Sequence, residues 1–408
     1  MTRTCRWPRI LLAAFLLLAL LPVATAQAQG KTYNLAMIAD FSGPYADVMK
    51  PMVAARNAVV DWWNAEVGAK LGIKLGYKAY DTRYDAAQVA SLWPGIKSEL
   101  NPVMVLGLGG PDVAALQQRL PDDKIPMLMS TGGYGFAWRP GSWVFNPRPT
   151  YTHELAGAVE WYHGKIGKKG KLKIAAVSSE ASPAYVDIHR GLQAYAAASD
   201  KAEIVEVIIA EVQPTDLTPQ IRRAVNAGAE VFLVPTNTAA VVATKRALQA
   251  IGKKIPVVTS SHNGLLFSGK AAGGLAQMEG DFEVYAMALA TESGPAFEFY
   301  KKLKDKYGFK ADWNVLAVQG IEQGLFGVRA LENAIKKMGG DKVTGQAVRD
   351  AVIGMPITSE STFGYLPDLT FSEEAPMPTS GTVNIGTVEG GKFKAAALGV
   401  PYPQIKKW

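Results

Sequence analysis

The chain has 408 residues, of which 48% are hydrophobic, and a formal net charge of +7 at neutral pH. This length allows two or three domains, each able to bury a full apolar core. The lysines are scattered, and no basic stripe is interleaved with aromatic residues. The composition therefore argues against a nucleic-acid partner.

The first residues have the three-part pattern of a secretory signal peptide. Arg3, Arg6 and Arg9 precede an apolar run, ILLAAFLLLALLPVATAQA, whose small residues offer two cleavage sites. A retained anchor is the alternative, although a spanning helix needs about 20 apolar residues. Removing residues 1–28 removes three arginines and no acid, which lowers the formal charge from +7 to +4. The single cysteine, Cys5, is lost too, so we expect a periplasmic mature chain without disulfides.

Strand-like and helical runs alternate along the first half of the mature chain. Strands are predicted over residues 33–40, 73–79, 103–108 and 126–130, with helices over 49–66, from Asp85, and over 111–120. Asp85 and Gln88 have the spacing of a capping box. Such alternation predicts a parallel sheet flanked by helices on both faces.

The same rhythm repeats in the second half. Strands are predicted over residues 172–179, 204–209, 231–235 and 255–260, with helices from Ser182, over 217–227 and over 238–251. After residue 280 come a strand, helices over 294–307 and 314–338, a short helix from Thr344 and a strand-rich tail. A segment rich in proline and aromatic residues, 139–154, separates the halves. We therefore predict two similar α/β lobes.

The turn after strand 103–108 is the main candidate for a binding site. Gly110 and Pro111 open the next helix and leave free backbone N–H groups, which suit a small anion such as a carboxylate. A dinucleotide fingerprint would need a glycine where the chain has Asp112, so no nucleotide cofactor is expected. The alternative is a plain tight turn in which Asp112 stabilises the start of the helix.

The next strand ends in hydroxyl side chains that would lie beside this turn. Ser130 and Thr131 could donate to the same anion, with Tyr134 as part of an apolar lid. The alternative is that these hydroxyls only cap local backbone groups.

Signatures of catalysis and metal binding are missing from the sequence. There is no G-x-S-x-G serine, no H-E-x-x-H motif and no cysteine that could act as a nucleophile in the mature chain. The four histidines are far apart and lack metal-ligand spacing. We therefore expect neither an enzyme nor a metal or other cofactor.

Several stretches, taken in order, resemble one family of proteins. LAMIADFSGPYAD, VLGLGGPDVAAL, KIPMLMSTGG and GTVNIGTVEGGKFKAA are similar to segments of the branched-chain amino-acid-type periplasmic solute-binding proteins of ABC transporters. The resemblance covers essentially the whole mature chain and implies a type I periplasmic binding fold, with two Rossmann-like lobes joined by a three-segment hinge. It implies an N-terminal lobe of residues 31–150 and 282–360 and a C-terminal lobe of residues 151–281 and 361–408.

The turn residues, the positions implied by the resemblance and the nearby aromatic residues give one predicted ligand-binding set. Its members are Tyr45, Gly110, Pro111, Asp112, Ser130, Thr131, Gly132, Gly133, Tyr134, Tyr151, Tyr185, Asn237 and His262. His262 stands where amino-acid binders of the family present an acid to the ligand's ammonium, and a histidine is a poor partner for that group. Two alternatives stay open: an aromatic or aliphatic acid without an amino group, or an amino acid whose ammonium contacts Asp47 or Asp112.

The resemblance also implies a function. The chain would be the extracytoplasmic component of an ABC importer that captures a small carboxylate between its lobes by hinge closure. Its partners would be that ligand and an ABC permease in the inner membrane, and the protein would be a monomer. The alternatives are a ligand-sensing receptor of the same fold that signals through a separate membrane protein, and an exported hydrolase.

Overall fold

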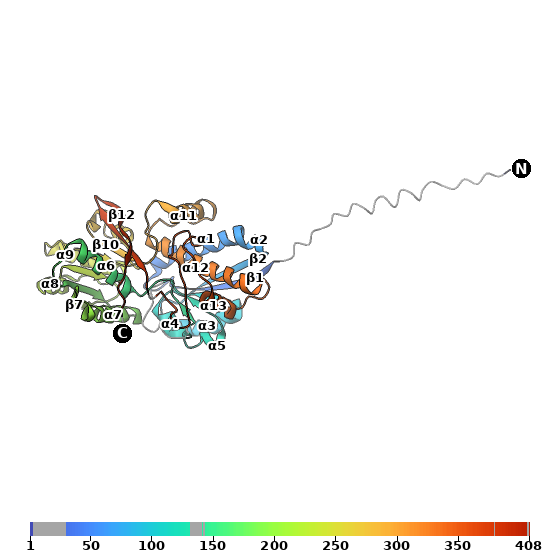
Figure 1. The fold of residues 1–408 in the computed structure, drawn as a ribbon, viewed down its shortest axis with the longest axis horizontal. Coiled ribbons are helices and arrows are strands. Elements are labelled where there is room, and N and C mark those ends of the chain that lie inside the picture. The colour runs from blue at the N-terminus through green and yellow to red at the C-terminus, as the bar shows by residue number, and fades with distance from the viewer. Residues whose placement is uncertain (3–29, 131–140, 142, 379, 406–407) are drawn as a thin grey trace.

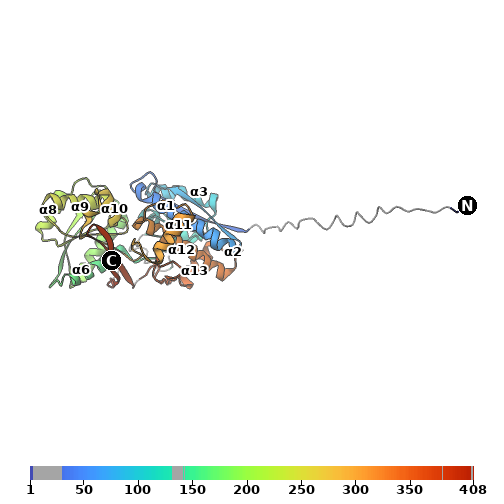
Figure 2. The same cartoon turned by 90° about the horizontal axis from the view of Figure 1, so that it is seen from above.

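The computed structural model describes residues 1–2, 30–130, 141, 143–378, 380–405 and 408. Nearly all of the predicted signal peptide therefore lies outside the described residues. The described chain forms two α/β lobes that lie side by side in both views (Figure 1, Figure 2). This arrangement confirms the predicted fold class of parallel sheets flanked by helices.

The first lobe is built on a five-stranded parallel sheet in the order β2-β1-β3-β4-β5. Its strands are β1 (Lys31–Ala39), β2 (Ile73–Asp81), β3 (Met104–Leu106), β4 (Met127–Leu128) and β5 (Val144–Phe145). Its helices are α1 (Ala46–Trp63), which continues through a π-turn into α2 (Ala69–Leu71), α3 (Ala86–Leu100), α4 (Gly110–Leu116), α5 (Leu120–Asp123), α11 (Gly294–Lys306), α12 (Val315–Met338) and α13 (Gly345–Gly354). The inner strands are continuous apolar runs because helices cover both faces of the sheet.

The second lobe is built on a seven-stranded sheet in the order β12-β11-β10-β9-β8-β6-β7. Its strands are β6 (Leu172–Ser178), β7 (Ala202–Ile209), β8 (Val231–Val234), β9 (Val257–Thr259), β10 (Phe282–Tyr285), β11 (Thr382–Glu389) and β12 (Lys392–Pro401). Its helices are α6 (Tyr151–Lys165), α7 (Pro183–Ala198), α8 (Thr218–Asn226), α9 (Thr238–Ala250), α10 (Leu265–Ala271) and a 3₁₀ turn (Leu275–Met278). Strands β6 to β10 pair in parallel, whereas β11 and β12 add an antiparallel hairpin at one edge.

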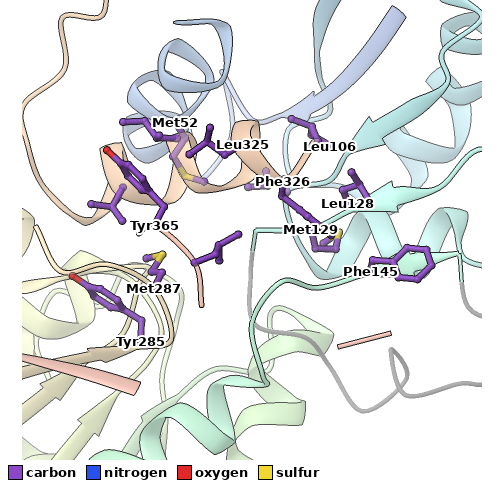
Figure 3. Packing of buried hydrophobic residues seen from close by; sticks show 14 of the residues in the cluster. Met52, Leu106, Leu128, Met129, Phe145, Tyr285, Met287, Leu325, Phe326 and Tyr365 are labelled. Atoms are coloured by element: carbon purple, nitrogen blue, oxygen red, sulfur yellow. The ribbon is translucent and has the colours of Figure 1, made fainter. Parts of the chain in front are cut away.

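Two glycines let α12 pack closely on α1. A Cβ atom at Gly320 would lie 2.6 Å from the carbonyl oxygen of Met52, and one at Gly324 would lie 2.9 Å from Cβ of Val59. Any larger residue at either position would push the helices apart. Figure 3 shows how Met52 of α1 and Leu325 and Phe326 of α12 continue this packing toward the sheet.

The structure differs from the sequence-based lobe boundaries at two places. Strand β10 pairs with β9 and β11 and so lies in the second sheet, although the N-terminal lobe was expected to resume at residue 282. Residues 361–371 pack on the first lobe, where Leu369 exchanges backbone hydrogen bonds with Ile357 and Phe371 contacts Phe145. At both places the sequence is apolar, and hydrophobic periodicity alone does not show in which of the two lobes an apolar segment is buried.

Stretches of the described chain cross between the lobes and hold one another in place. Residues 146–150 precede α6, residues 286–293 follow β10, and a third stretch leads into β11. The amide of Asn146 donates to the carbonyl of Pro376 at 3.0 Å, and the side chain of Asn384 donates to the carbonyl of Met287 at 2.9 Å. Hydrogen bonds thus connect the segments that cross between the lobes.

Candidate functional site

A small enclosed space, the inner cavity, lies between the lobes at the carboxyl ends of the first-lobe strands. Its free volume is about 20 Å³. It is lined by Tyr45, Val48, Met52, Tyr84, Leu108, Gly109, Tyr151, Ala184, His262, Leu316 and Gln319. Open α/β sheets bind ligands at the carboxyl ends of their strands. The inner cavity is therefore the candidate binding site.

The glycine turn after β3 forms part of the first-lobe wall. The carboxylate of Asp112 accepts hydrogen bonds from the backbone amides of Leu108 and Gly109, at 2.5 and 3.1 Å. Asp112 is fully buried, and burial raises its pKa to about 6. The glycine turn also lies against Tyr84, since a Cβ atom at Gly109 would lie 3.0 Å from the tyrosine hydroxyl oxygen. Two amides are thus satisfied within the turn, as the tight-turn alternative describes.

Ser130 lies just after β4 and is fully buried beneath the cavity. Its carbonyl oxygen accepts hydrogen bonds from Arg148 Nη2 at 2.5 Å and from Gln319 Nε2 at 3.1 Å. Gln319 also lines the inner cavity, so it links Ser130 to the candidate site. The other residues predicted here, Thr131, Gly132, Gly133 and Tyr134, lie outside the described residues.

A chain of hydrogen bonds fixes the second-lobe wall. Nδ1 of His262 lies 3.2 Å from the carbonyl oxygen of Pro235, which can only accept, so Nδ1 carries the proton. Nε2 therefore accepts from the hydroxyl of Tyr151, at 2.7 Å. Burial lowers the pKa of His262 to about 4, so the ring is neutral near pH 7. His262 thus presents an uncharged ring whose nitrogens already have protein partners.

Two buried tyrosine hydroxyls near the cavity have no hydrogen-bond partner among the described residues. They belong to Tyr45 and Tyr185, which are 5% and 1% exposed. Tyr45 lines the inner cavity, and the ring of Tyr185 stands edge-on to His262 at a centroid distance of 6.2 Å. A buried hydroxyl that lacks a partner costs stability, because it has lost its hydrogen bonds to water. These hydroxyls are therefore available to a ligand oxygen.

An outer cavity of about 460 Å³ adjoins the inner one and shares Tyr45 with it. Asp47 of the first lobe and Arg246 of the second also line it. Asn237 lies in its wall as the N-cap of α9, where its side-chain oxygen accepts from the amide of Ala240 at 3.0 Å. The outer cavity thus places polar and charged groups of both lobes next to the inner cavity.

Charged side chains are buried below the first-lobe wall. Arg148 and Glu154 form an ion pair at 3.3 Å, and Glu154 also accepts from the amide of Ala286 at 2.8 Å. Neither carboxylate oxygen of Glu322 has a hydrogen-bond partner among the described residues, and burial raises the pKa of this group to about 8. Burying charge is costly, so this group of residues is better explained as holding geometry than as adding stability.

The structure brings three predicted residues, Tyr45, Tyr151 and His262, to the inner cavity. Two residues that the sequence did not single out, Tyr84 and Gln319, also line it. Tyr84 follows β2 at the carboxyl edge of the sheet, where such folds bind ligands, and this position could have identified it from the sequence. Gln319 lies far along the chain in α12, and no local pattern pointed to it.

The described residues contain no group of three or more His, Cys, Asp or Glu side chains arranged to hold a metal ion. Across that same part of the chain, no helix combines the length and apolarity that crossing a bilayer requires. The candidate site offers hydroxyls, amides and aromatic rings, which bind a solute by hydrogen bonds and packing.

Comparisons with known proteins agree with this architecture. Residues 32–391 match a family model described as periplasmic binding protein. No curated protein sequence matches the chain.

Solved structures show the same fold at low sequence identity. A branched-chain amino acid ABC transporter protein from Thermus thermophilus, with bound valine, is 20% identical with a TM-score of 0.78, covering 91% of this chain and 97% of that one. A fatty acid ABC transporter substrate-binding protein from Thermomonospora curvata is 19% identical with a TM-score of 0.76, covering 92% and 95%. A solute-binding protein from Rhodopseudomonas palustris HaA2, in complex with p-hydroxybenzoic acid, is 19% identical with a TM-score of 0.73, covering 93% and 99%.

Proposed function

Because this chain belongs to the periplasmic binding protein family, we propose that it captures a small carboxylate-bearing solute for an ABC importer. The family consists of solute-binding proteins and not of enzymes, which confirms the non-enzymatic character predicted from the sequence. The ABC permease and the carboxylate are the partners that this role requires.

One observation carries the proposal. The inner cavity is lined from both lobes, and Tyr45 in its wall has a buried hydroxyl with no hydrogen-bond partner among the described residues. Small-molecule sites combine apolar walls with a few placed polar groups, as this cavity does. A carboxylate oxygen would complete the hydrogen bonding of the first-lobe wall.

The second-lobe wall favours an acid without an amino group. The His262 ring is neutral, and its lone pair already accepts from Tyr151. Asp112 points into the turn, where its carboxylate accepts hydrogen bonds from two backbone amides. Of the two acids considered as partners for a ligand ammonium, only Asp47 therefore faces the cleft. Solved relatives hold valine or p-hydroxybenzoic acid, and we infer that this chain takes an aromatic or aliphatic acid of similar size.

Capture would proceed by closure of the two lobes. The ligand would dock on the first lobe and gain contacts with Tyr151, Tyr185 and His262 when the second lobe closes. A ligand favours the closed form only through such extra contacts. The small free volume of the inner cavity, about 20 Å³, means that the lobes must separate to admit it.

The proposal is tested with the mature protein and three acids: 4-hydroxybenzoate, octanoate and L-valine. We expect at least one to raise the melting temperature and to bind by calorimetry, with 4-hydroxybenzoate or octanoate tighter than L-valine. Tyr45→Phe should weaken that binding by roughly 3- to 10-fold, since one hydrogen bond contributes about 0.5–1.5 kcal/mol. Tyr80→Phe is the matched control because its hydroxyl donates to Glu99, away from the cavity. Binding by none of a broad acid panel would refute the proposal.

The remaining expectations belong to the same proposal. We propose that the chain acts in the periplasm after cleavage of its signal peptide and that it is a monomer. N-terminal sequencing of the exported protein and light scattering of the purified chain test these two points.

A further inference from the structure

The loop between β2 and α3 places Tyr84 in the cleft with an unusual backbone. Arg83 and Tyr84 both have left-handed conformations, with φ of 56° and 54°. Left-handed backbone is uncommon outside glycine and persists where neighbouring contacts enforce it. Here the Asp81 carboxylate accepts from the amides of Arg83 and Phe41, at 3.1 and 2.9 Å, and fixes the loop against the turn after β1.

This conformation directs the Tyr84 side chain across the glycine turn. Its ring lies 4.5 Å from the ring of Tyr45, measured between centroids. A Cβ atom at Gly109 would lie only 2.8 Å from the Tyr84 ring, so the glycine is needed for this approach. Tyr84 therefore packs tightly against the first-lobe wall of the inner cavity.

The hydroxyl of Tyr84 joins the two lobes. It lies 3.3 Å from Oγ of Ser182, the N-cap of α7 in the second lobe, and a Cβ atom at Gly109 in the first lobe would lie 3.0 Å from it. A Cβ atom at Gly110 would itself lie 3.2 Å from that serine oxygen. One phenolic oxygen thus stands between the glycine turn and the second lobe.

We propose that Tyr84 is an internal substitute for the ligand's oxygen, and that it sets both ligand affinity and the balance between open and closed lobes. This inference rests on the proposed function, in which the first-lobe wall receives a carboxylate. The Tyr84 hydroxyl lies against the glycine turn in the wall of the inner cavity and contacts Ser182 of the other lobe, so an incoming carboxylate must displace it. This contact therefore favours the closed arrangement of the lobes without a ligand, and the ligand competes with the Tyr84 side chain for the same position.

The test is Tyr84→Phe, which keeps the ring packing and removes the hydroxyl. We expect the variant to bind 4-hydroxybenzoate, octanoate or L-valine, whichever binds the wild type best, about 3- to 10-fold more tightly by calorimetry, because one competing hydrogen bond is lost. The unliganded variant should also show a larger radius of gyration by small-angle scattering, since the lobes lose a contact. Tyr80→Phe, in the strand that precedes this loop, should change neither quantity.

Ser182→Ala provides a second variant from the other lobe. It removes the other end of the same contact, so it should enlarge the unliganded radius to a similar extent, and the double variant should add nothing further. Circular dichroism and the melting temperature check that each variant is folded.

Each measurement can overturn the inference. Weaker binding by Tyr84→Phe would make the hydroxyl a ligand contact, and unchanged binding would make it irrelevant. An unchanged radius in both variants would remove the link between the lobes. Failure of the wild type to bind any of the acids would count against the proposed function, and the radius alone would then decide this inference.

Discussion

The two walls of the cleft are built in different ways. The first-lobe wall rests on buried charged groups with fixed partners, among them Asp112 and Arg148, which lie behind the backbone that faces the cavity. The second-lobe wall consists of Tyr151, Tyr185 and a neutral His262. Buried charges with fixed partners hold backbone groups in one geometry, whereas aromatic rings select by shape. The first wall is therefore suited to positioning a charged head, and the second to discriminating among ligand bodies.

The largest expected effect concerns the charged support. Arg148→Met should lower the free energy of unfolding by about 3–5 kcal/mol, because it leaves the buried Glu154 carboxylate without its cation. It also removes a donor to the Ser130 carbonyl, so binding of the best acid should weaken as well. Urea denaturation and calorimetry measure the two effects.

A surface ion pair of the same length is the matched control. Arg223 and Glu206 also lie 3.3 Å apart, but their side chains are 61% and 25% exposed. Arg223→Met should change stability by less than about 1 kcal/mol. Equal losses of stability in Arg148→Met and Arg223→Met would show that burial does not make the Arg148–Glu154 pair more important than a surface pair.

The neutral wall is tested by placing a charge in it. His262→Glu should bring an acid to the position that faces the ligand and favour L-valine over 4-hydroxybenzoate by roughly tenfold or more. A charge-assisted hydrogen bond contributes about 1.5–3 kcal/mol, and the acid also repels a second carboxylate. His262→Gln, which stays neutral, should leave the ratio of the two affinities almost unchanged. A constant ratio in the glutamate variant would show that this wall does not decide ligand class.

The last expected effect is a dependence of stability on pH. Burial raises the pKa of Glu322 from 4.5 to about 8, so the folded chain keeps a proton that the unfolded chain releases. This contribution to stability is present below about pH 4.5 and is lost as pH rises through 8. Relative to Glu322→Gln, the wild type should lose up to about 1.4 kcal/mol per pH unit within that window. Urea denaturation at pH 5 and pH 8 measures this, and an equal difference at both would contradict it.

The order of strands and helices was predictable because buried strands and capped helices leave local patterns. The residues at which each element begins and ends were harder to predict. The helix expected over 111–120 divides into α4, which ends at Leu116, and α5, which begins at Leu120. Pro121 lacks an amide hydrogen and cannot continue the earlier helix, and this explains the break.

The candidate site was predictable only where one segment carries it. Gly110 and Tyr45 follow strand ends, and the family resemblance pointed to His262. The inward turn of Asp112 was one of the two alternatives that the sequence left open. By contrast, Tyr84 has a backbone conformation that its residue type disfavours, and Gln319 reaches the cavity from the distant helix α12. Such features arise from tertiary packing and leave no local pattern.

The hairpin of β11 and β12 has a consequence for how the chain acquires its shape. These strands come from residues 382–401, yet they complete a sheet whose first strand begins at Leu172. Contacts this remote in sequence form slowly, since a long loop must close first. A nascent chain that lacks residues 382–401 therefore cannot finish its second lobe, and the edge of the unfinished sheet stays exposed to chaperones until those residues have been made.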